Sequence, residues 1–119
     1  MCFNAAVSNL DNHPRNHALL AKERDWRLSP AYDLTPAPVI AIDRRNLAMV
    51  RGQFGRYANR ENLFSQHGRF LLSQEEATAI LDGIVEAVRS EWLPAMLRAG
   101  VNNADCEAIS SAFLYDGFL

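Results

Sequence analysis

Residues 9–16 read Asn-Leu-Asp-Asn-His-Pro-Arg-Asn, and residues 26–34 read Trp-Arg-Leu-Ser-Pro-Ala-Tyr-Asp-Leu. The segment that joins these stretches, residues 17–28, contains two short apolar runs on either side of a charged turn, which predicts a β-hairpin. In the first stretch Asp11 and Asn16 are five residues apart, and the second stretch carries another acidic residue near its end. The hairpin and the polar residues around it decide the fold of this half of the chain.

The order of these polar residues is the one that phosphoryl transfer needs. Because a hairpin brings its two ends together, we expect Asn16 and Asp33 to meet across its base. Protein kinases place a catalytic Asp five residues before a magnesium-binding Asn, and a hairpin then returns the chain to a second magnesium-binding Asp. Mg²⁺ prefers oxygen ligands and keeps several waters, so these two side chains suffice where ATP phosphates supply the rest. The sequence Asp-Asn-His-Pro also favours a plain turn, and the spacing alone supports both interpretations equally.

A family resemblance favours the catalytic interpretation. Phe3-Asn4, residues 11–20 and residues 26–34 closely resemble the C-terminal part of HipA-type toxin kinases, in which an apolar helix precedes D-x-H-x-x-N and then L-x-P-x-Y-D. These proteins are bacterial serine/threonine kinases of toxin–antitoxin systems. The resemblance extends over the whole chain, and it implies the C-terminal, helical lobe of a protein-kinase-like fold.

The resemblance also implies roles for individual residues. Asp11 would be the catalytic base, and Asn16 and Asp33 would be the magnesium ligands. His13 would belong to the catalytic loop and shape it rather than transfer protons. The implied cofactors of the complete enzyme are Mg²⁺ and ATP, and one implied partner is a HipB-like DNA-binding antitoxin.

Several elements of a complete kinase are not found in this sequence. No Gly-rich phosphate loop and no strand lysine precede Asp11, and Lys22, the single lysine, lies in the expected hairpin turn. No His-Arg precedes Asp11 and no Phe-Gly follows Asp33, which favours the HipA branch over classical kinases. The first residues suggest a helix already under way. We therefore expect a lobe that needs an N-terminal ATP-binding lobe or subunit and is inactive alone; the alternative is a non-catalytic remnant that serves as a protein-interaction module.

The rest of the chain predicts a mostly α architecture with small β-hairpins. We expect one domain over residues 1–119, with the catalytic loop and magnesium motif in residues 9–34 and a helical bundle in residues 57–119. A second hairpin is expected from the apolar runs at residues 39–42 and 47–50. The expected helices cover residues 1–10, 59–69 and 73–99, and a last one runs from Asn102 or Asn103 to Phe113. The helix over 73–99 is expected to begin with a capping box at Ser73, to kink or restart at Pro94 and to end at Gly100. Its apolar stripe consists of Ala77, Ile80, Leu81, Ile84, Val88 and Trp92.

Composition limits the remaining classes of function. The 119 residues suit one globular domain, and the net charge of −2 disfavours nucleic acid as a direct partner. The two cysteines form no CxxC motif and no apolar run is long enough to span a membrane, so we expect a cytoplasmic protein. His13 and His17 are four residues apart, but Pro14 between them argues against a helical zinc site. Exposed apolar surface on such a lobe would favour a second copy or another partner.

Overall fold

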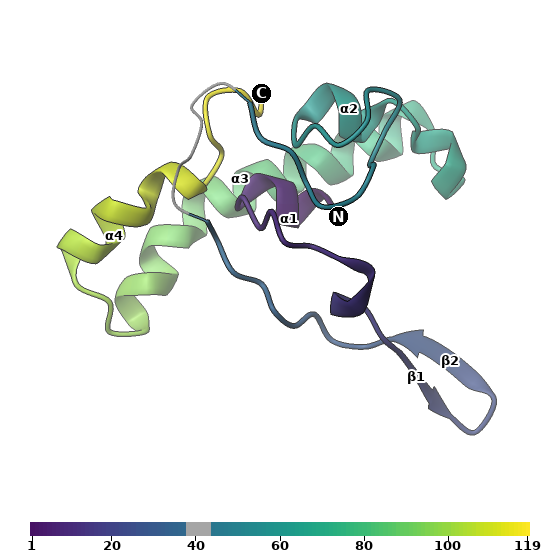
Figure 1. The fold of residues 1–119 in the computed structure, drawn as a ribbon, viewed down its shortest axis with the longest axis horizontal. Coiled ribbons are helices and arrows are strands. Elements are labelled where there is room, and N and C mark those ends of the chain that lie inside the picture. Colours follow the sequence, from purple (N-terminus) through teal and green to yellow (C-terminus); the bar gives the residue numbers. More distant parts are fainter. Residues whose placement is uncertain (38–43) are drawn as a thin grey trace.

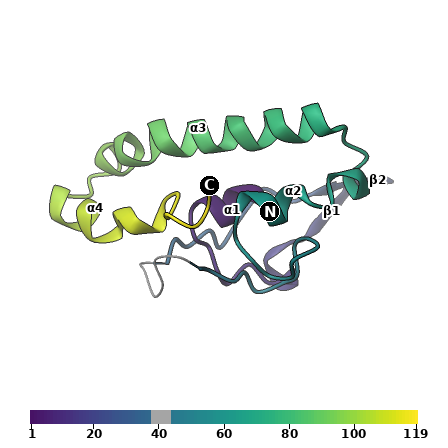
Figure 2. The ribbon, with the colours of Figure 1, turned by 90° about the horizontal axis from the view of Figure 1, so that it is seen from above.

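The computed structural model describes residues 1–37 and 44–119 of the chain. The described residues form a mostly helical domain with one two-stranded antiparallel hairpin, as the sequence predicts. The long helix α3 lies along one side of the molecule, with α1 beneath it and the hairpin beyond (Figure 1, Figure 2). The elements in chain order are α1 (Cys2–Ala6), β1 (Leu19–Lys22), β2 (Asp25–Leu28), α2 (Arg60–Phe64), α3 (Gln74–Arg98) and α4 (Asn103–Ile109), with 3-10 turns at Pro14–Asn16, His67–Phe70 and Ser110–Ala112.

The hydrophobic core lies between α1 and α3. Ala5 and Ala6 are fully buried, and their small side chains allow the short helix to pack directly against the long one. α3 contributes a buried face, and residues from the loops and the C-terminal segment close the core from the other side. The buried core residues are Ala5, Ala6, Val7, Leu47, Ala58, Leu63, Leu81, Val85, Val88, Tyr115 and Phe118.

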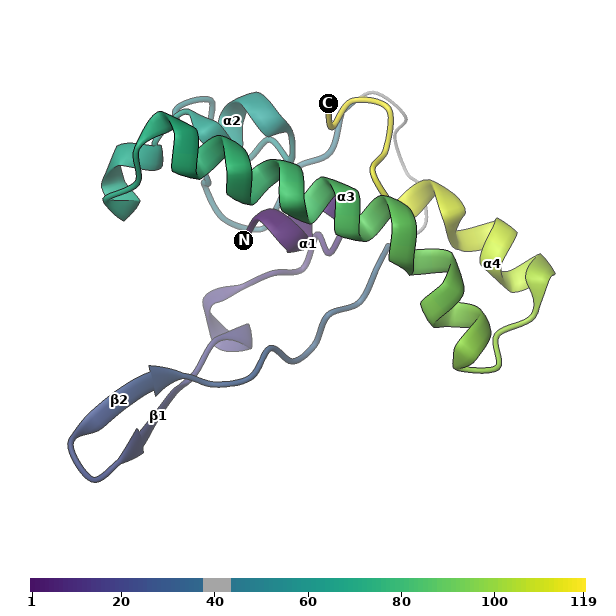
Figure 3. The same ribbon diagram turned by 180° about the vertical axis from the view of Figure 1, so that it is seen from behind.

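Helix α3 begins and ends as predicted. The Ser73 hydroxyl accepts a hydrogen bond from the Glu76 backbone N–H (3.1 Å), and the Glu76 carboxylate accepts one from the Ser73 backbone N–H (2.8 Å). The helix continues through Pro94 as one element and bends in its last turns (Figure 3). Gly100 follows with φ +85°, and the N–H groups of Gly100 and Val101 return to the carbonyls of Leu97 and Met96. This is the Schellman arrangement, which a glycine at this position favours.

The apolar stripe of α3 was predicted with one error in its register. Ala77, Leu81 and Val88 are buried as expected, but the fourth buried residue is Val85, which the predicted stripe omits. Ile80, which the stripe includes, is 45% exposed. Ile80 lines an apolar groove with Phe3 and Phe70, whereas Val85 belongs to the packed core.

Three predicted helices are shorter in the structure. The helix expected over residues 1–10 ends at Ala6, because Ser8 has φ +52° and turns the chain away from the helix axis. The helix expected over residues 59–69 is split into α2 and the 3-10 turn at His67–Phe70. The last helix begins at its Asn102 cap as predicted but ends at Ile109 and continues as a single 3-10 turn.

The second predicted hairpin is not formed by the residues that the structure describes. Its first run, residues 39–42, lies outside the described residues, and residues 47–50 form no strand. The Leu47 N–H instead donates to the Arg56 carbonyl (2.8 Å), and an isolated bridge joins Asn46 and Tyr57. Gly52 and Gly55 close the loop between them.

The C-terminal residues return to α1 and fix its end. The Leu114 N–H donates to the Ala6 carbonyl (2.7 Å), and the Ser8 hydroxyl donates to the Ala112 carbonyl (2.6 Å). The Arg60 N–H donates to the Phe118 carbonyl (2.8 Å), and Phe118 is almost completely buried. These bonds hold the point at which the polar segment 9–16 leaves the helical body.

Candidate active site

The site residues lie on the segments that enter and leave the hairpin. Segment 9–16 follows α1 and ends in the 3-10 turn at Pro14–Asn16, where proline occupies the first position. Strands β1 and β2 then pair antiparallel, with Leu19 opposite Leu28 and Lys22 opposite Asp25. The prediction that Lys22 lies in the turn was wrong, because the strand pairing extends through Lys22 and Asp25. A further bond from the Ser29 N–H to the Ala18 carbonyl (2.8 Å) extends the pairing toward the site. The hairpin itself extends away from the helical body (Figure 1, Figure 3).

Asn16 links the two segments across the base of the hairpin. Its Nδ2 donates to the Asp11 backbone carbonyl (2.9 Å) and to the Asp33 Oδ2 (2.8 Å). Because both partners are acceptors, the amide nitrogen must face them, and Oδ1 points elsewhere. The structure therefore brings Asn16 and Asp33 together at the base of the hairpin, as the sequence predicts.

The backbone of Asp33 has the left-handed conformation, with φ +54°. Asp is one of the few non-glycine residues that adopt this conformation with some frequency. The Asp33 carbonyl accepts a hydrogen bond from the Nδ2 of buried Asn9 (3.2 Å). The neighbouring Tyr32 hydroxyl donates to the Arg15 carbonyl (2.7 Å), so Tyr32 also connects the two segments.

The carboxylate of Asp11 faces solvent and has two basic side chains beside it. Its side chain is 65% exposed, and the Nε2 of His13 lies 3.0 Å from one oxygen. The Nη2 of Arg15 lies 3.3 Å and 3.2 Å from the two oxygens. Such exposed pairs contribute roughly 0–1 kcal/mol to stability. The sequence analysis gave Arg15 no role, because a spacing of four residues predicts a contact only within a helix and Pro14 argues against one here.

The oxygen atoms of Asn16 and Asp33 suit a hard divalent cation. Asn16 offers an amide oxygen and Asp33 a carboxylate, which is the donor chemistry that Mg²⁺ takes, and in this structure Asn16 presents its Nδ2 rather than its Oδ1 to Asp33. Within residues 1–37 and 44–119, no group of three or more His, Cys, Asp or Glu side chains forms a self-sufficient metal cluster. The donor set thus fits an ion that completes its shell with water and phosphate oxygens rather than one enclosed by protein.

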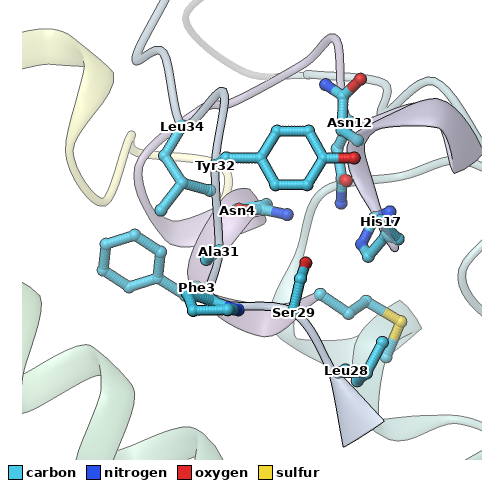
Figure 4. Close-up of a pocket in the computed structure, with 12 residues that line it drawn as sticks. Phe3, Asn4, Asn12, His17, Leu28, Ser29, Ala31, Tyr32 and Leu34 are labelled. Carbon is cyan, nitrogen blue, oxygen red and sulfur yellow. The ribbon is translucent and has the colours of Figure 1, made fainter. Parts of the chain in front are cut away.

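A pocket of about 210 Å³ adjoins these residues (Figure 4). Asn4, Asn12, Asn16 and His17 give it polar walls, whereas Phe3, Leu28, Tyr32 and Leu34 give it apolar ones. In the view of Figure 4 the Tyr32 ring lies between Leu34 and Asn12, with Asn4 below it. The pocket lies between α1, which contributes Phe3 and Asn4, and the segment that returns from the hairpin.

Arg51, which comes much later in the sequence, supports the loop of residues 9–16. Its Nη2 donates to the Asn12 carbonyl (3.0 Å), and burial lowers the pKa of its guanidinium. Two buried donors, Asn12 Nδ2 and Arg51 Nε, have no hydrogen-bond partner among the described residues. Nothing in the sequence pattern distinguishes Arg51 from the other ten arginines, so the sequence analysis missed it.

The helical body, the hairpin and the acidic residues at its base define the class of the protein: a helical lobe of the kinase-like type. The family profile described as HipA-like C-terminal domain matches residues 1–92, and the chain belongs to this family, which is a family of serine/threonine kinases. The predicted resemblance is thereby confirmed over residues 1–92, which include Asp11, His13, Asn16 and Asp33; residues 93–119 lie outside the match. Neither the curated proteins nor the solved structures gave a match. No helix within the described part of the chain is long and apolar enough to cross a membrane.

Proposed function

We propose that this chain is the C-terminal lobe of a HipA-like serine/threonine kinase of a toxin–antitoxin system, and that it carries the catalytic base and the magnesium ligands. The observation that carries the proposal is a pair of hydrogen bonds: the Asn16 Nδ2 donates to the backbone carbonyl of Asp11 and to the carboxylate of Asp33. A plain turn needs neither the second acidic residue nor its return across a hairpin. Family membership supports the same assignment.

In this proposal Asp11 accepts the proton of a Ser or Thr hydroxyl as its oxygen attacks the γ-phosphorus of ATP. Its exposed carboxylate is accessible to a substrate, but both of its oxygens contact Arg15 or His13. At least one of these two side chains must move away before an Asp11 oxygen can accept the proton. Asn16 and Asp33 would hold Mg²⁺, which when bound neutralises charge on the phosphates. His13 shapes the loop and contributes positive charge only when protonated.

An ATP-binding lobe is the first partner that we propose. One face of the hairpin carries the pairs Leu19–Leu28 and Ala21–Trp26, and the residues of both strands are exposed. An isolated two-stranded hairpin is marginally stable in water, so a partner on this face would stabilise it. A HipB-like DNA-binding antitoxin and a second copy of the chain are further proposed partners, suggested by the family and by the exposed apolar surface.

Calorimetric titration with Mg²⁺-ATP tests the proposed site. We expect binding by the wild-type chain that is lost in Asp33→Asn and kept in Asp25→Asn, a matched change at an exposed hairpin aspartate paired with Arg27. Equal binding by all three proteins would contradict the assignment of Asp33. Absence of binding by the wild-type chain would mean that the site forms only together with the ATP-binding lobe.

A phosphorylation assay tests the need for a second lobe. We expect no autophosphorylation by the pure chain, because its single lysine, Lys22, lies opposite Asp25 at the turn end of the hairpin and not at the base, where Asn16 and Asp33 meet. Autophosphorylation that disappears in Asp11→Ala would contradict this part of the proposal.

The alternative function is a non-catalytic interaction module. A groove of about 340 Å³ between α1, α2 and α3 favours it, since apolar side chains such as Phe3, Phe70 and Ile80 line the groove and remain about half exposed. This alternative predicts self-association or partner binding that is unchanged in Asp33→Asn. Sedimentation velocity of the wild-type and Asp33→Asn chains, together with the titration above, separates the two functions.

A further inference from the structure

We propose that Asn9 is a positioning residue of the site: its buried side-chain amide fixes the backbone of Asp33 and thereby aims the Asp33 carboxylate at Asn16. This inference rests on the proposed function, because it concerns the residue that would hold the metal. It adds a residue that neither the D-x-H-x-x-N pattern nor the L-x-P-x-Y-D pattern contains.

Asn9 is itself rigidly held. Its side chain is almost completely buried, and its backbone N–H donates to the Asn4 carbonyl (2.8 Å). It directly follows Ser8, whose left-handed backbone and hydroxyl bond to the Ala112 carbonyl fix the exit from α1. A side chain held in this way presents its Nδ2 in one direction, and that Nδ2 donates to the Asp33 carbonyl (3.2 Å).

Asp33 needs such a partner because its backbone is left-handed, a conformation that L-residues adopt infrequently. Asn9 binds its carbonyl, and Asn16 binds its carboxylate at 2.8 Å. With both ends of the residue held, rotation about its backbone would break one bond or the other. Tyr32 on one side and Ala37 on the other anchor the flanking chain to Arg15 and Ser8, but neither contact involves Asp33 itself.

The experiment uses the full ¹⁵N-labelled chain and the exchange of side-chain amide protons with water, measured by NMR. Asn9→Leu keeps the branched shape of the side chain and removes its donor. Tyr115→Phe is the control, because it removes the buried bond from the Tyr115 hydroxyl to the Ala58 carbonyl (2.9 Å) while leaving the ring that packs under Arg45 in place. The measured quantity is the exchange rate of the Asn16 Nδ2 protons, which the bond to Asp33 protects.

We expect Asn9→Leu to raise the Asn16 exchange rate about tenfold, the change that corresponds to about 1.4 kcal/mol. Tyr115→Phe should leave the Asn16 exchange rate within about twofold of wild type, even if it lowers the melting temperature as much as Asn9→Leu does. An Asn16 rate in Asn9→Leu that matches the Tyr115→Phe rate would overturn the inference, because Asn9 would then be only a packing residue.

A measurement on the wild-type chain covers the case in which Asn9→Leu fails to fold. The Nδ2 protons of Asn9 should exchange at least about tenfold more slowly than those of exposed Asn103, and similar rates would overturn the inference. Titration of the same samples with Mn²⁺ separates this inference from the proposed function. If Mn²⁺ fails to broaden the Asn16 and Asp33 signals, the metal site is refuted, while the exchange rates still decide whether Asn9 positions Asp33.

Discussion

Replacement of Asn16 by alanine should destabilise the domain by about 2 kcal/mol. The change removes two hydrogen bonds, one to the Asp33 carboxylate and one to the Asp11 carbonyl. A bond to a charged group is worth roughly 1.5–3 kcal/mol and a neutral one roughly 0.5–1.5 kcal/mol. Both bonds are only partly buried, so water can replace part of what is lost, and the lower end of the combined range applies.

Asn12→Ala is the control for this prediction. Asn12 belongs to the same loop and is more deeply buried, but its Nδ2 has no partner among the described residues. Its truncation therefore removes packing without a donated bond, and we expect a cost below about 1 kcal/mol. The comparison between these two asparagines separates the effect of the bonds from the effect of a smaller side chain.

Urea denaturation followed by circular dichroism measures both changes. The midpoint should fall clearly for Asn16→Ala and little for Asn12→Ala, with the slope unchanged in both because the same surface unfolds. A loss of about 2 kcal/mol is a substantial fraction of the 5–15 kcal/mol typical of a domain. If Asn16→Ala costs no more than Asn12→Ala, the two bonds across the base of the hairpin do not contribute to stability and the reasoning fails.

Further predictions concern the helices and the central loop. Gly52→Ala should cost about 1–3 kcal/mol in urea denaturation, because its Cβ would lie 1.9 Å from the Asn62 carbonyl oxygen. Gly83→Ala should instead stabilise by about 0.5–1 kcal/mol, since Gly83 lies inside α3 with open space around its Cβ position; equal effects of the two changes would contradict both. Bonds from Ser73 lower the pKa of Glu76 from 4.5, so the carboxylate stabilises α3 above this value and the contribution is lost as pH falls through the lowered pKa. Glu76→Ala should therefore melt below wild type at pH 7 and approach it near pH 2, and a constant difference across this range would refute the assignment.

Local signals in the sequence were sufficient for much of the fold. The capping box at Ser73, the Asn102 cap and the hairpin over residues 17–28 each depend on residues close in sequence, and all three are present. The meeting of Asn16 and Asp33 followed from the hairpin alone, since its geometry dictates where its ends lie.

The features that the sequence analysis missed depend on contacts between distant residues. Asn9 reaches Asp33 and Arg51 reaches Asn12 only after the chain has folded, and no spacing rule relates these pairs. The premature end of α1 has the same origin: Ser8 leaves the helix to bond with Ala112, more than one hundred residues later. Val85 is buried in a core that also contains Ala5 and Phe118, residues far from it in the sequence.

The return of the C-terminal segment to α1 has a consequence for the order of folding. The bonds that fix the exit from α1 come from Ala112 and Leu114, so this exit cannot be fixed while those residues are still within the ribosome. Closing a loop of this length carries an entropic cost that must be met before the contacts can form. Helix α3 can form earlier, because its caps are local. During synthesis, the segment that carries Asp11 and Asn16 should therefore reach its native geometry only after Ala112 and Leu114 have been made, although it precedes α3 in the sequence.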